Sequence, residues 1–472
     1  MPSWVCITQS GSRLKSEDTI VSKYNKLSYI VMFSLLAIMA CADSKDETEE
    51  NLSQTDPQQN IILIIIDTLR ADHLSCYGYH RNTSPAIDSL AAEGTLWANA
   101  QAQAPWTLPA HATIWTGLSV RSHRTLNPVP IMSESGEIQK LIYTLDKDLP
   151  SLPVLLSEAG FSTRGIANFT ILSDVYGFDA GFDQYSCNED GAGRAGISVD
   201  SLIIWLDEHS DERFFCMMHL YDVHSPYSPP EPYNTAFQED PDTEYFDWEI
   251  HGDEILNKGS RDIAIDLYDG EISWVDDNLS RLFSWVRENS LEDETLIVVI
   301  SDHGEEFLEH DWVLHGETLF QEVLWIPLIM SGPGIERGTI DSTYVGQFDL
   351  LPTLLSWAGV ECTSYFDGID ILSGPGGDRV IPSSGTSNFV WTERDQMAST
   401  VYNHSKTIMM NEMQDFVSFD LVNDPVEQIP LPGDSAGIED VLFYWATPQR
   451  GFPGFATSDE ATIQTLRDLG YI

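Results

Sequence analysis

Five ionisable side chains follow three strongly apolar runs of the sequence. Asp67 comes directly after one run, Asp302 and His303 come just after a second, and Asp222 and His224 follow a third. Mixed carboxylate and imidazole ligands favour Zn²⁺ or Mn²⁺, whereas Ca²⁺ prefers oxygen ligands alone. Each acid taken singly is equally well explained as a helix N-cap or a loop residue. Because one shared cation would remove the repulsion between buried acids, we predict a Zn or Mn site made of Asp67, Asp302 and His303.

The elements that must position these residues are buried parallel strands. The runs Asn60–Ile66 (NIILIII), Arg213–Leu220 (RFFCMMHL) and Thr295–Ile300 (TLIVVI) are apolar throughout, which is typical of strands covered on both faces. Helices are predicted at Ser84–Glu93 and, from apolar residues spaced three and four apart, at 272–286. Strands alternating with helices predict a mainly parallel, three-layer α/β sandwich, whose ligands bind at the carboxyl ends of its strands.

A short helix is predicted within the segment 104–118 (APWTLPAHATIWTGL), with Pro109 near its start and Gly117 at its end. Thr107 then lies at or just before the helix N-terminus, where free backbone N–H groups can hold an anionic oxygen. A plain N-cap role explains Thr107 equally well. The segment is therefore a candidate nucleophile turn.

From residue 60 onward the chain resembles the sulfatase family of the alkaline phosphatase superfamily. The matching motifs, in family order, are NIILIIIDTLRADHL, SPAIDSLAAEGTLWANAQAQAPWTLPAHATIWTG, YDVHSPYSPP, YDGEISWVDD, SDHGEEF, HGETLF, QFDLLPTLLSWAG, FDLVNDPVEQ and LRDLGYI. The resemblance implies an alkaline-phosphatase-like α/β/α sandwich at 60–360 and a smaller α+β subdomain at 361–472. Within 361–472, VWTER, STVYN, KTIMMN and FVSFDL have the alternation of short antiparallel strands.

The chain departs from this family at the positions that define a sulfatase. Its members carry C-x-P-S-R or S-x-P-S-R, whose first residue is oxidised to formylglycine, where this chain has Thr107–His111 (TLPAH). Threonine cannot yield the aldehyde because its methyl group blocks Cβ, so no formylglycine is expected. The other departures are Asp67-Thr68 for an Asp-Asp pair, Asp302-His303 for Asp-Asn, and His315 for a lysine.

These departures resemble the threonine branches of the superfamily: nucleotide pyrophosphatase/phosphodiesterases, lipoteichoic acid synthases and phosphoethanolamine transferases. That resemblance implies that Thr107 is both a metal ligand and the nucleophile. His111, His224 and His315 are then candidate catalytic residues. A second metal site would use Asp222, His224 and His315, although two-zinc relatives have a longer Asp-to-His spacing. We expect one metal, with this second site open.

The expected activity is hydrolysis of small-molecule, glycan or lipid esters through a covalent Thr107 intermediate. Thr107 and the residues around it favour phosphate mono- or diesters as the substrates. Three alternatives stay open: sulfate ester hydrolysis without formylglycine, transfer of a phosphoryl-linked group within the envelope, and ligand binding without catalysis. Transferases of this kind usually carry several transmembrane helices, which the sequence lacks.

Other polar residues are assigned no direct role. Arg70 is expected to pair with a carboxylate near the site. Glu271 and Asp276 are expected either to support the site or to form the polar face of their helix. Structural or exposed positions are expected for the remaining histidines considered, His73, His123, His219 and His310.

The overall charge excludes one class of partner. With 24 Lys and Arg against 74 Asp and Glu, the formal net charge is -50. A surplus of this size repels nucleic acid backbones, so no nucleic acid partner is expected. The sequence predicts no oligomeric state.

The N-terminus has the pattern of an export signal. An apolar run at 27–40 follows Lys23 and Lys26 and ends before Cys41, resembling a lipoprotein processing box. An ordinary cleaved signal or an anchor helix is the alternative. The polar, acidic stretch 42–59 is expected to be a flexible linker. We therefore predict an exported protein at the cell envelope, lipid-anchored at Cys41 and touching the membrane only there.

Overall fold

The computed structural model describes residues 59–125, 129–132, 138–188, 194–238, 258–374, 379–386, 396–410, 415–432, 435–445 and 454–457. The predicted signal segment and nearly all of the acidic linker fall outside this part of the chain. Among the described residues no helix is long and apolar enough to cross a membrane. The residues from Pro57 onward belong to one compact unit, so the boundary expected near residue 360 stays a prediction.

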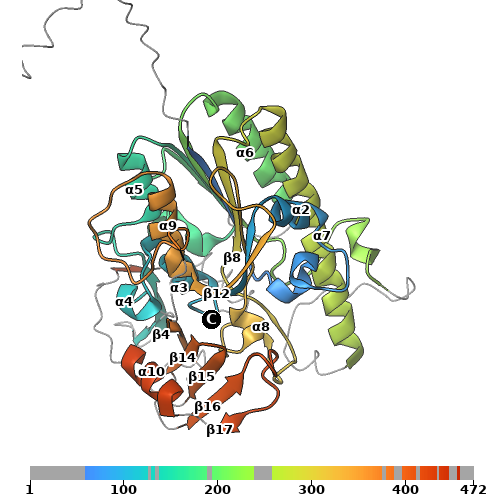
Figure 1. Cartoon of the computed structure of the whole chain (residues 1–472), viewed down its shortest axis with the longest axis vertical. Helices are drawn as coiled ribbons and strands as arrows, with labels where there is room; N and C mark the ends of the chain where they lie inside the picture. The colour runs from blue at the N-terminus through green and yellow to red at the C-terminus, as the bar shows by residue number, and fades with distance from the viewer. Residues whose placement is uncertain are drawn as a thin grey trace, which may run out of the picture. The chain divides into compact units, whose positions relative to one another are not determined.

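A mixed eight-stranded sheet forms the centre of the molecule (Figure 1). Five of its neighbouring pairs are parallel, and only β11 runs antiparallel to its two neighbours. The sequence predicted the parallel part and did not predict β11. The strand order is β12 (Thr339–Gly346), β2 (Thr95–Gln101), β11 (Leu328–Ser331), β8 (Thr295–Ser301), β1 (Asn60–Ile66), β7 (Phe214–Leu220), β5 (Ser162–Ala167) and β6 (Gln184–Cys187).

Helices cover both faces of this sheet, which confirms the three-layer prediction. The side chains of β1 alternate between two separate apolar cores, one containing Ile61, Leu63 and Ile65 and the other Ile62 and Ile64. This alternation explains why the run NIILIII is apolar throughout. The first core includes α3 (Thr107–Thr116), α5 (Leu152–Glu158) and α9 (Leu350–Trp357), and the second α2 (Pro85–Glu93), α6 (Ala195–His209) and α7 (Lys258–Glu288).

A separate antiparallel sheet lies near the C-terminus, as predicted, although the segment VWTER lies outside the described residues. One of its faces packs through Ala398 and Met409 on Val441 of a helix. The strands are β13 (Ile381–Thr386), β14 (Gln396–Tyr402), β15 (Ser405–Met410), β16 (Asp415–Asp420) and β17 (Leu431–Pro432), and the helix is α10 (Ser435–Trp445). We call these five strands the C-terminal sheet.

Shorter elements connect these layers. Two small sheets contain β9 (Glu306–Phe307) with β10 (Val313–Leu314), and β3 (Val129–Met132), β4 (Ile138–Thr144) and β18 (Gly454–Thr457). The short helices are α4 (Val120–His123) and α8 (Gln321–Leu324). Single 3₁₀ turns lie at Ala71–His73, Ser75–Tyr77, Thr170–Leu172, Asp174–Tyr176, Tyr233–Thr235 and Gln347–Asp349.

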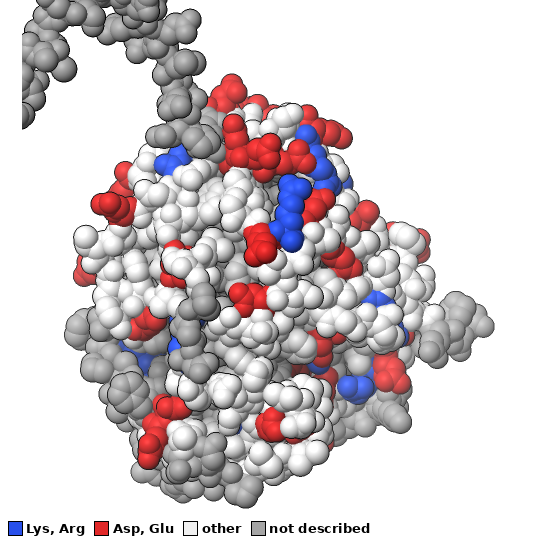
Figure 2. Space-filling model, viewed as in Figure 1, with Lys and Arg blue, Asp and Glu red and all other residues white. Residues whose placement is uncertain are grey.

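Acidic side chains are spread over the visible surface of the molecule rather than gathered on one element. Figure 2 shows Asp and Glu from top to bottom of this face, with fewer Lys and Arg between them. This distribution agrees with the charge balance of the sequence. The visible face therefore offers no broad basic surface of the kind that binds nucleic acid.

Candidate active site

The predicted ligands Asp67, Asp302 and His303 meet at one edge of the central sheet. β1 and β8 are parallel neighbours with Ile66 opposite Ser301, so the residues that follow both strands emerge side by side. The Nε2 atom of His303 lies 3.6 Å from Asp67 Oδ1 and 3.5 Å from Asp302 Oδ2. All three side chains are fully buried. The structure therefore assembles the three residues that the sequence singled out.

Backbone contacts fix the orientation of two of these side chains. Asp302 Oδ1 accepts the N–H groups of Thr68 (3.2 Å) and His303 (2.8 Å), and Thr68 reaches it with a left-handed φ of 55°. The ring of His303 donates from Nδ1 to the carbonyl of Gly304 at 2.9 Å. Because Nδ1 carries the proton, the lone pair lies on Nε2, as a metal-bound imidazole requires.

Thr107 is the first residue of α3 and faces these ligands. Its Oγ1 lies 3.4 Å from Nε2 of His303. The N-cap position belongs to Trp106, so the plain N-cap explanation for Thr107 does not hold. Gly117 ends the helix in the left-handed region, as its position in the sequence predicted.

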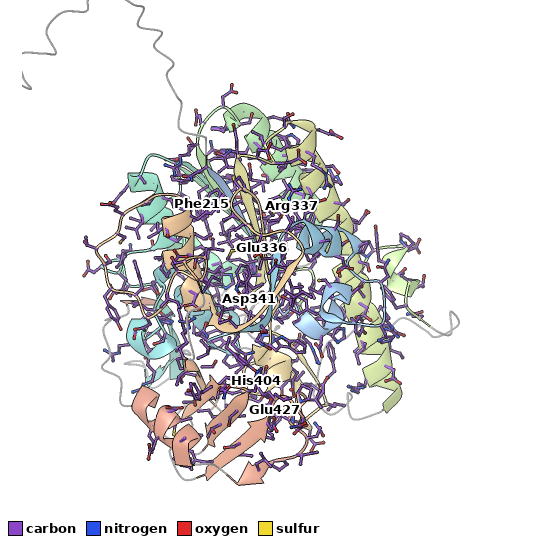
Figure 3. All side chains as sticks on the ribbon, viewed as in Figure 1. Phe215, Glu336, Arg337, Asp341, His404 and Glu427 are labelled. Carbon is purple, nitrogen blue, oxygen red and sulfur yellow. The ribbon has the colours of Figure 1, made fainter. Side chains whose placement is uncertain are left out.

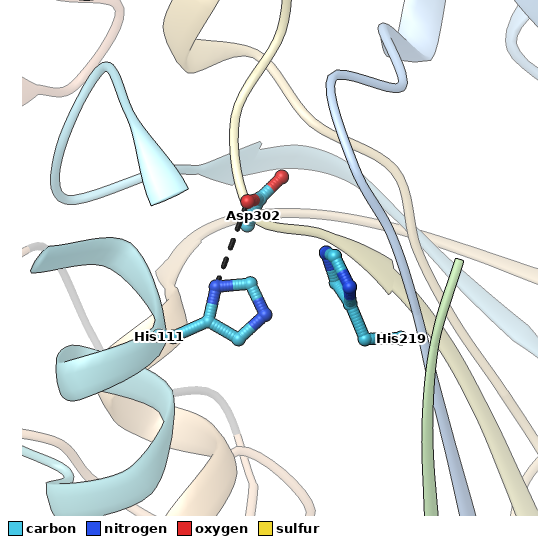
Figure 4. A group of neighbouring side chains, drawn as sticks. All are labelled: His111, His219 and Asp302. Atoms are coloured by element: carbon cyan, nitrogen blue, oxygen red, sulfur yellow. Dashed lines mark ion pairs between the residues drawn. The ribbon is translucent and has the colours of Figure 1, made fainter. Parts of the chain in front are cut away.

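Two further histidines complete this centre, and the sequence assigned neither of them to the metal. Figure 4 shows His111 and His219 on either side of Asp302. The ligand atoms of these three residues lie within 4.8 Å of one another. His111 donates from Nδ1 to the carbonyl of Thr107 at 3.0 Å and lies 3.5 Å from Asp302 Oδ2. Nε2 of His219 lies 3.1 Å from Asp67 Oδ2. His219, expected to be structural, therefore contacts a predicted metal ligand directly.

The possible second metal site of Asp222, His224 and His315 is not among the candidate groups that the structure brings together. Asp222 Oδ1 accepts the N–H of Ala195 at 3.0 Å and the indole N–H of Trp274 at 2.9 Å, so the carboxylate is bound at the start of α6. Its position two residues before His224 does not bring it to the histidine rings, because the chain turns after β7. Among the described residues, candidate groups of three or more metal-ligating side chains comprise only the two sets around Asp302.

His224 and His315 nevertheless lie together beside the centre. Their ring centroids are 4.9 Å apart, and His315 lies 4.3 Å from the ring of His303. Nδ1 of His315 lies 2.9 Å from Glu305 Oε1, and the other carboxylate oxygen of Glu305 accepts from Tyr227 at 2.9 Å. Glu305 was not predicted from the sequence, where its only signal was its position two residues after His303. The Glu305 carboxylate therefore fixes the orientation of the His315 ring through Nδ1.

Burial changes the protonation of the whole centre. It raises the pKa of both Asp67 and Asp302 to about 7, and in Asp302 repulsion from Asp67 contributes to the increase. It lowers the pKa of His111 to about 3 and that of His219 to about 4, so both imidazoles are neutral near pH 7. Asp67 Oδ1 and Asp302 Oδ2 are buried and have no hydrogen-bond partner. Neutral imidazoles beside two unpaired carboxylate oxygens fit a divalent cation.

The remaining residues singled out in the sequence have contacts outside this centre. Arg70 pairs with Asp72 and Glu309, as expected for an arginine near the site. Asp276 accepts two N–H groups at the start of α2, and Glu271 accepts the N–H of Ser228. Hydrogen bonds hold the other three histidines: His73 to Asp269, His123 to Thr113, and His310 to Glu322.

Comparison with known proteins agrees with this fold. The family profile named Sulfatase matches residues 59–360. An N-acetylglucosamine-6-O-sulfatase of Bacteroides thetaiotaomicron is 25% identical over 452 residues, covering 76% of this chain and 77% of that protein. A multifunctional alkaline phosphatase superfamily protein of Trinickia caryophylli is 25% identical over 395 residues, covering 67% and 76%.

Solved structures show the same fold. The phosphonate monoester hydrolase of Agrobacterium radiobacter superposes with a TM-score of 0.67 at 19% identity, covering 82% of this chain and 94% of that one. Because the family profile spans more than half of the sequence, the chain belongs to the sulfatase family of metal-dependent ester hydrolases.

Proposed function

We propose that this chain hydrolyses singly charged phosphorus esters, such as phosphodiesters or phosphonate monoesters, through a covalent Thr107 ester. The position of Thr107 carries the proposal. Its hydroxyl lies at the N-terminus of α3 and 3.4 Å from His303, within the cluster of candidate metal ligands. No residue that yields formylglycine occupies this position, so the hydroxyl itself is the available nucleophile.

The charge of the centre favours a singly charged substrate. Within the part of the chain that the structure describes, the ionisable groups that act most strongly on Asp67 and Asp302 are neighbouring carboxylates and imidazoles, with no guanidinium or ammonium group among them. A divalent cation and the carboxylates of Asp67 and Asp302 together carry no net charge. A phosphate monoester brings two negative charges at neutral pH, whereas a phosphodiester or phosphonate monoester brings one. The electrostatic cost of binding is therefore lower for the singly charged esters.

Thr107, His315 and Glu305 have separate roles in the proposed reaction. The Thr107 oxygen attacks phosphorus, and the bond between phosphorus and the leaving oxygen breaks. The proton lost by Thr107 passes through His315 to the leaving oxygen, while Glu305 stabilises the imidazolium that forms transiently. Water then gives a proton to His315 and attacks phosphorus, which releases Thr107 as the proton returns to its oxygen. His224, whose ring lies against that of His315, is the candidate for contact with an oxygen of the substrate.

Asp67, Asp302, His303 and Thr107 would hold the metal, for which the mixed ligand set favours Zn or Mn over Ca. When bound, such a cation lowers the pKa of a coordinated hydroxyl and stabilises negative charge on phosphorus oxygens. His111 and His219 would support it, His219 through its contact with Asp67 Oδ2.

Sulfate monoesters are the second candidate class. They also carry one negative charge, and the curated relatives include N-acetylglucosamine-6-O-sulfatase and a hexuronate-2-O-sulfatase of the same bacterium. Threonine would then attack sulfur directly, without formylglycine.

A panel of p-nitrophenyl esters separates these classes. We expect the Zn- or Mn-loaded protein to turn over a phosphodiester and a phosphonate monoester roughly tenfold or more faster than the phosphate monoester. Turnover of the sulfate ester alone would overturn the phosphorus assignment. Product analysis with and without glycerol separates the transferase alternative, because a transferase would release the first product only when an alcohol such as glycerol receives the phosphoryl group in place of water.

We also propose that the protein is exported and lipid-anchored at Cys41. The support is the apolar run at 27–40, its preceding lysines and the Ala40-Cys41 boundary. Expression in a bacterial host should place the protein in the membrane fraction, and Cys41→Ala should prevent lipid labelling. Labelling that persists in Cys41→Ala would refute the anchor.

A further inference from the structure

A fully buried ion pair connects the C-terminal sheet to the main body of the molecule. Lys406 of β15 lies 2.9 Å and 3.1 Å from the two carboxylate oxygens of Glu427, and both side chains have no exposed surface. Glu427 itself adopts a left-handed φ of 54°, which a non-glycine residue holds only when its surroundings enforce it. Figure 3 labels Glu427 beside the C-terminal sheet.

The carboxylate of Glu427 also binds the segment that contains α8. Its Oε2 accepts the N–H of Gln321 at 2.5 Å. Nearby, His310 lies 3.0 Å through Nε2 from the carbonyl of Glu427 and 2.5 Å through Nδ1 from Glu322 Oε1. Since a carbonyl and a carboxylate can only accept, His310 satisfies both by carrying two protons. Glu427 and His310 therefore hold the segment 320–324 at two neighbouring residues, Gln321 and Glu322.

The same segment holds the loop that carries two predicted metal ligands. The N–H groups of Gly304 and Glu305 donate to the carbonyls of Val323 (2.8 Å) and Glu322 (3.0 Å). A Cβ at position 304 would overlap the Glu322 carbonyl, so glycine is required for this close approach. These two hydrogen bonds follow directly after Asp302 and His303.

The segment also holds the chain that leads to the nucleophile. The side-chain amides of Gln321 and Gln101 exchange two hydrogen bonds of 3.1 and 3.2 Å, and Ala102 donates to the carbonyl of Leu324 at 2.8 Å. Gln101 ends β2, six residues before Thr107. The segment 320–324 thus fixes the position of the nucleophile turn relative to the loop that carries Asp302 and His303.

We propose that Glu427 is a positioning residue, which through Gln321 aligns the Asp302–Glu305 loop with the nucleophile turn. The catalytic consequence rests on the proposed function, but the structural consequence does not. The C-terminal sheet would then contribute to turnover through Lys406 and Glu427. Lys406 supplies the charge that allows the Glu427 carboxylate to remain ionised in a buried position.

Two double variants separate the hydrogen bond from the ion pair. Removing only one partner leaves a buried charge unpaired and risks unfolding, so both variants neutralise the pair. Lys406→Met/Glu427→Gln keeps an oxygen that can accept from Gln321, whereas Lys406→Met/Glu427→Leu leaves no acceptor there. Thr407→Val is the matched control in the same strand, since it removes the buried 2.8 Å contact of Thr407 with Ser418 without touching α8.

Hydrogen exchange of the Gly304 and Glu305 amides in the metal-free protein is the first readout. We expect roughly tenfold or faster exchange in the leucine variant, with wild-type exchange in the glutamine and Thr407→Val variants. The amides of β1 provide an internal reference, because global destabilisation would accelerate them as well. Unchanged exchange in the leucine variant, or equal acceleration in all three variants, overturns the proposal.

Steady-state kinetics is the second readout. In the leucine variant kcat should fall about 10- to 100-fold with KM nearly unchanged, and the glutamine variant should restore most of it. A rise in KM alone would contradict a positioning role. Inactivity of the wild-type protein on every ester would refute the proposed function, while the exchange measurement would still decide the role of Glu427.

Discussion

Thr107→Ala should reduce turnover of the preferred ester by roughly 10⁴-fold or more, because it removes the attacking atom while leaving the rest of the centre in place. The side chain is fully buried and its hydroxyl contacts His303. Loss of one hydroxyl at the first position of α3 should leave the helix intact. Circular dichroism and the metal content of the purified variant check that fold and metal are retained.

Thr107→Ser is the matched control for this prediction. Serine keeps the oxygen and loses only the methyl group, so most of the activity should remain. Undiminished turnover in Thr107→Ala would exclude Thr107 as nucleophile. Equal loss in both variants would instead indicate that the methyl group, rather than the oxygen, is required.

Asp302→Asn should strongly weaken metal binding and lower activity with it. Asp302 is common to both candidate ligand groups, and its Oδ2 lies 3.5 Å from both His111 and His303. Asparagine can keep the two backbone hydrogen bonds made to Oδ1 but removes the charge. We expect metal affinity to fall by more than the roughly 10- to 100-fold that loss of a residue supporting a ligand costs. Isothermal titration with Zn²⁺ and Mn²⁺ measures the change.

The same substitution should stabilise the metal-free protein. Asp67 and Asp302 repel each other in a buried site, where burial raises the pKa of both to about 7. Raised carboxyl pKa values mean that the folded state loses stability as pH rises from about 4 towards 7. Asp302→Asn should recover about 1 kcal/mol or more at pH 7.

Asp276→Asn serves as the control for the stability change. Its carboxylate is also buried, and burial also raises its pKa to about 7, but it accepts N–H groups at the start of α2. Metal binding should be unaffected by this change. Lower stability of metal-free Asp302→Asn than of wild type would contradict the repulsion argument.

The sequence predicted most reliably the strands and helices whose residue pattern has a single physical cause. The apolar runs ending at Ile66 and Leu220 are strands because burial on both faces demands apolar side chains at every position. Pro109 and Gly117 located α3 because each favours one end of a helix. The ends of adjacent strands then brought Asp67 and Asp302 together.

The predictions that failed depend on neighbours that lie far apart in sequence. His219 is the only polar side chain in its buried strand, and a lone histidine there is usually structural. Its contact with Asp67 follows from the pairing of β7 with β1, which spacing alone does not reveal. Asp222 was grouped with His224 by proximity in sequence, but its carboxylate binds the start of α6.

Glu305 and Glu427 were missed for a related reason. Both lie within family-like motifs, and their roles come from the partners that the fold gives them, His315 for one and Lys406 with Gln321 for the other. The antiparallel position of β11 likewise depends on the path of the chain after β8. The local sequence pattern indicates which residues are buried and where helices end. The contacts of Glu305 and Glu427 and the pairing of β11 depend instead on the topology of the chain.

The covalent intermediate on Thr107 is the most direct test of this account. Metal-loaded protein is mixed with the fastest phosphorus ester, quenched in acid within one turnover, digested and analysed by mass spectrometry, with Thr107→Ala as the blank. We predict that the peptide containing Thr107 carries the phosphoryl or phosphonyl group of the substrate, and that the blank carries none. An unmodified Thr107 peptide during a single turnover that releases product, or the group on another residue, would contradict it.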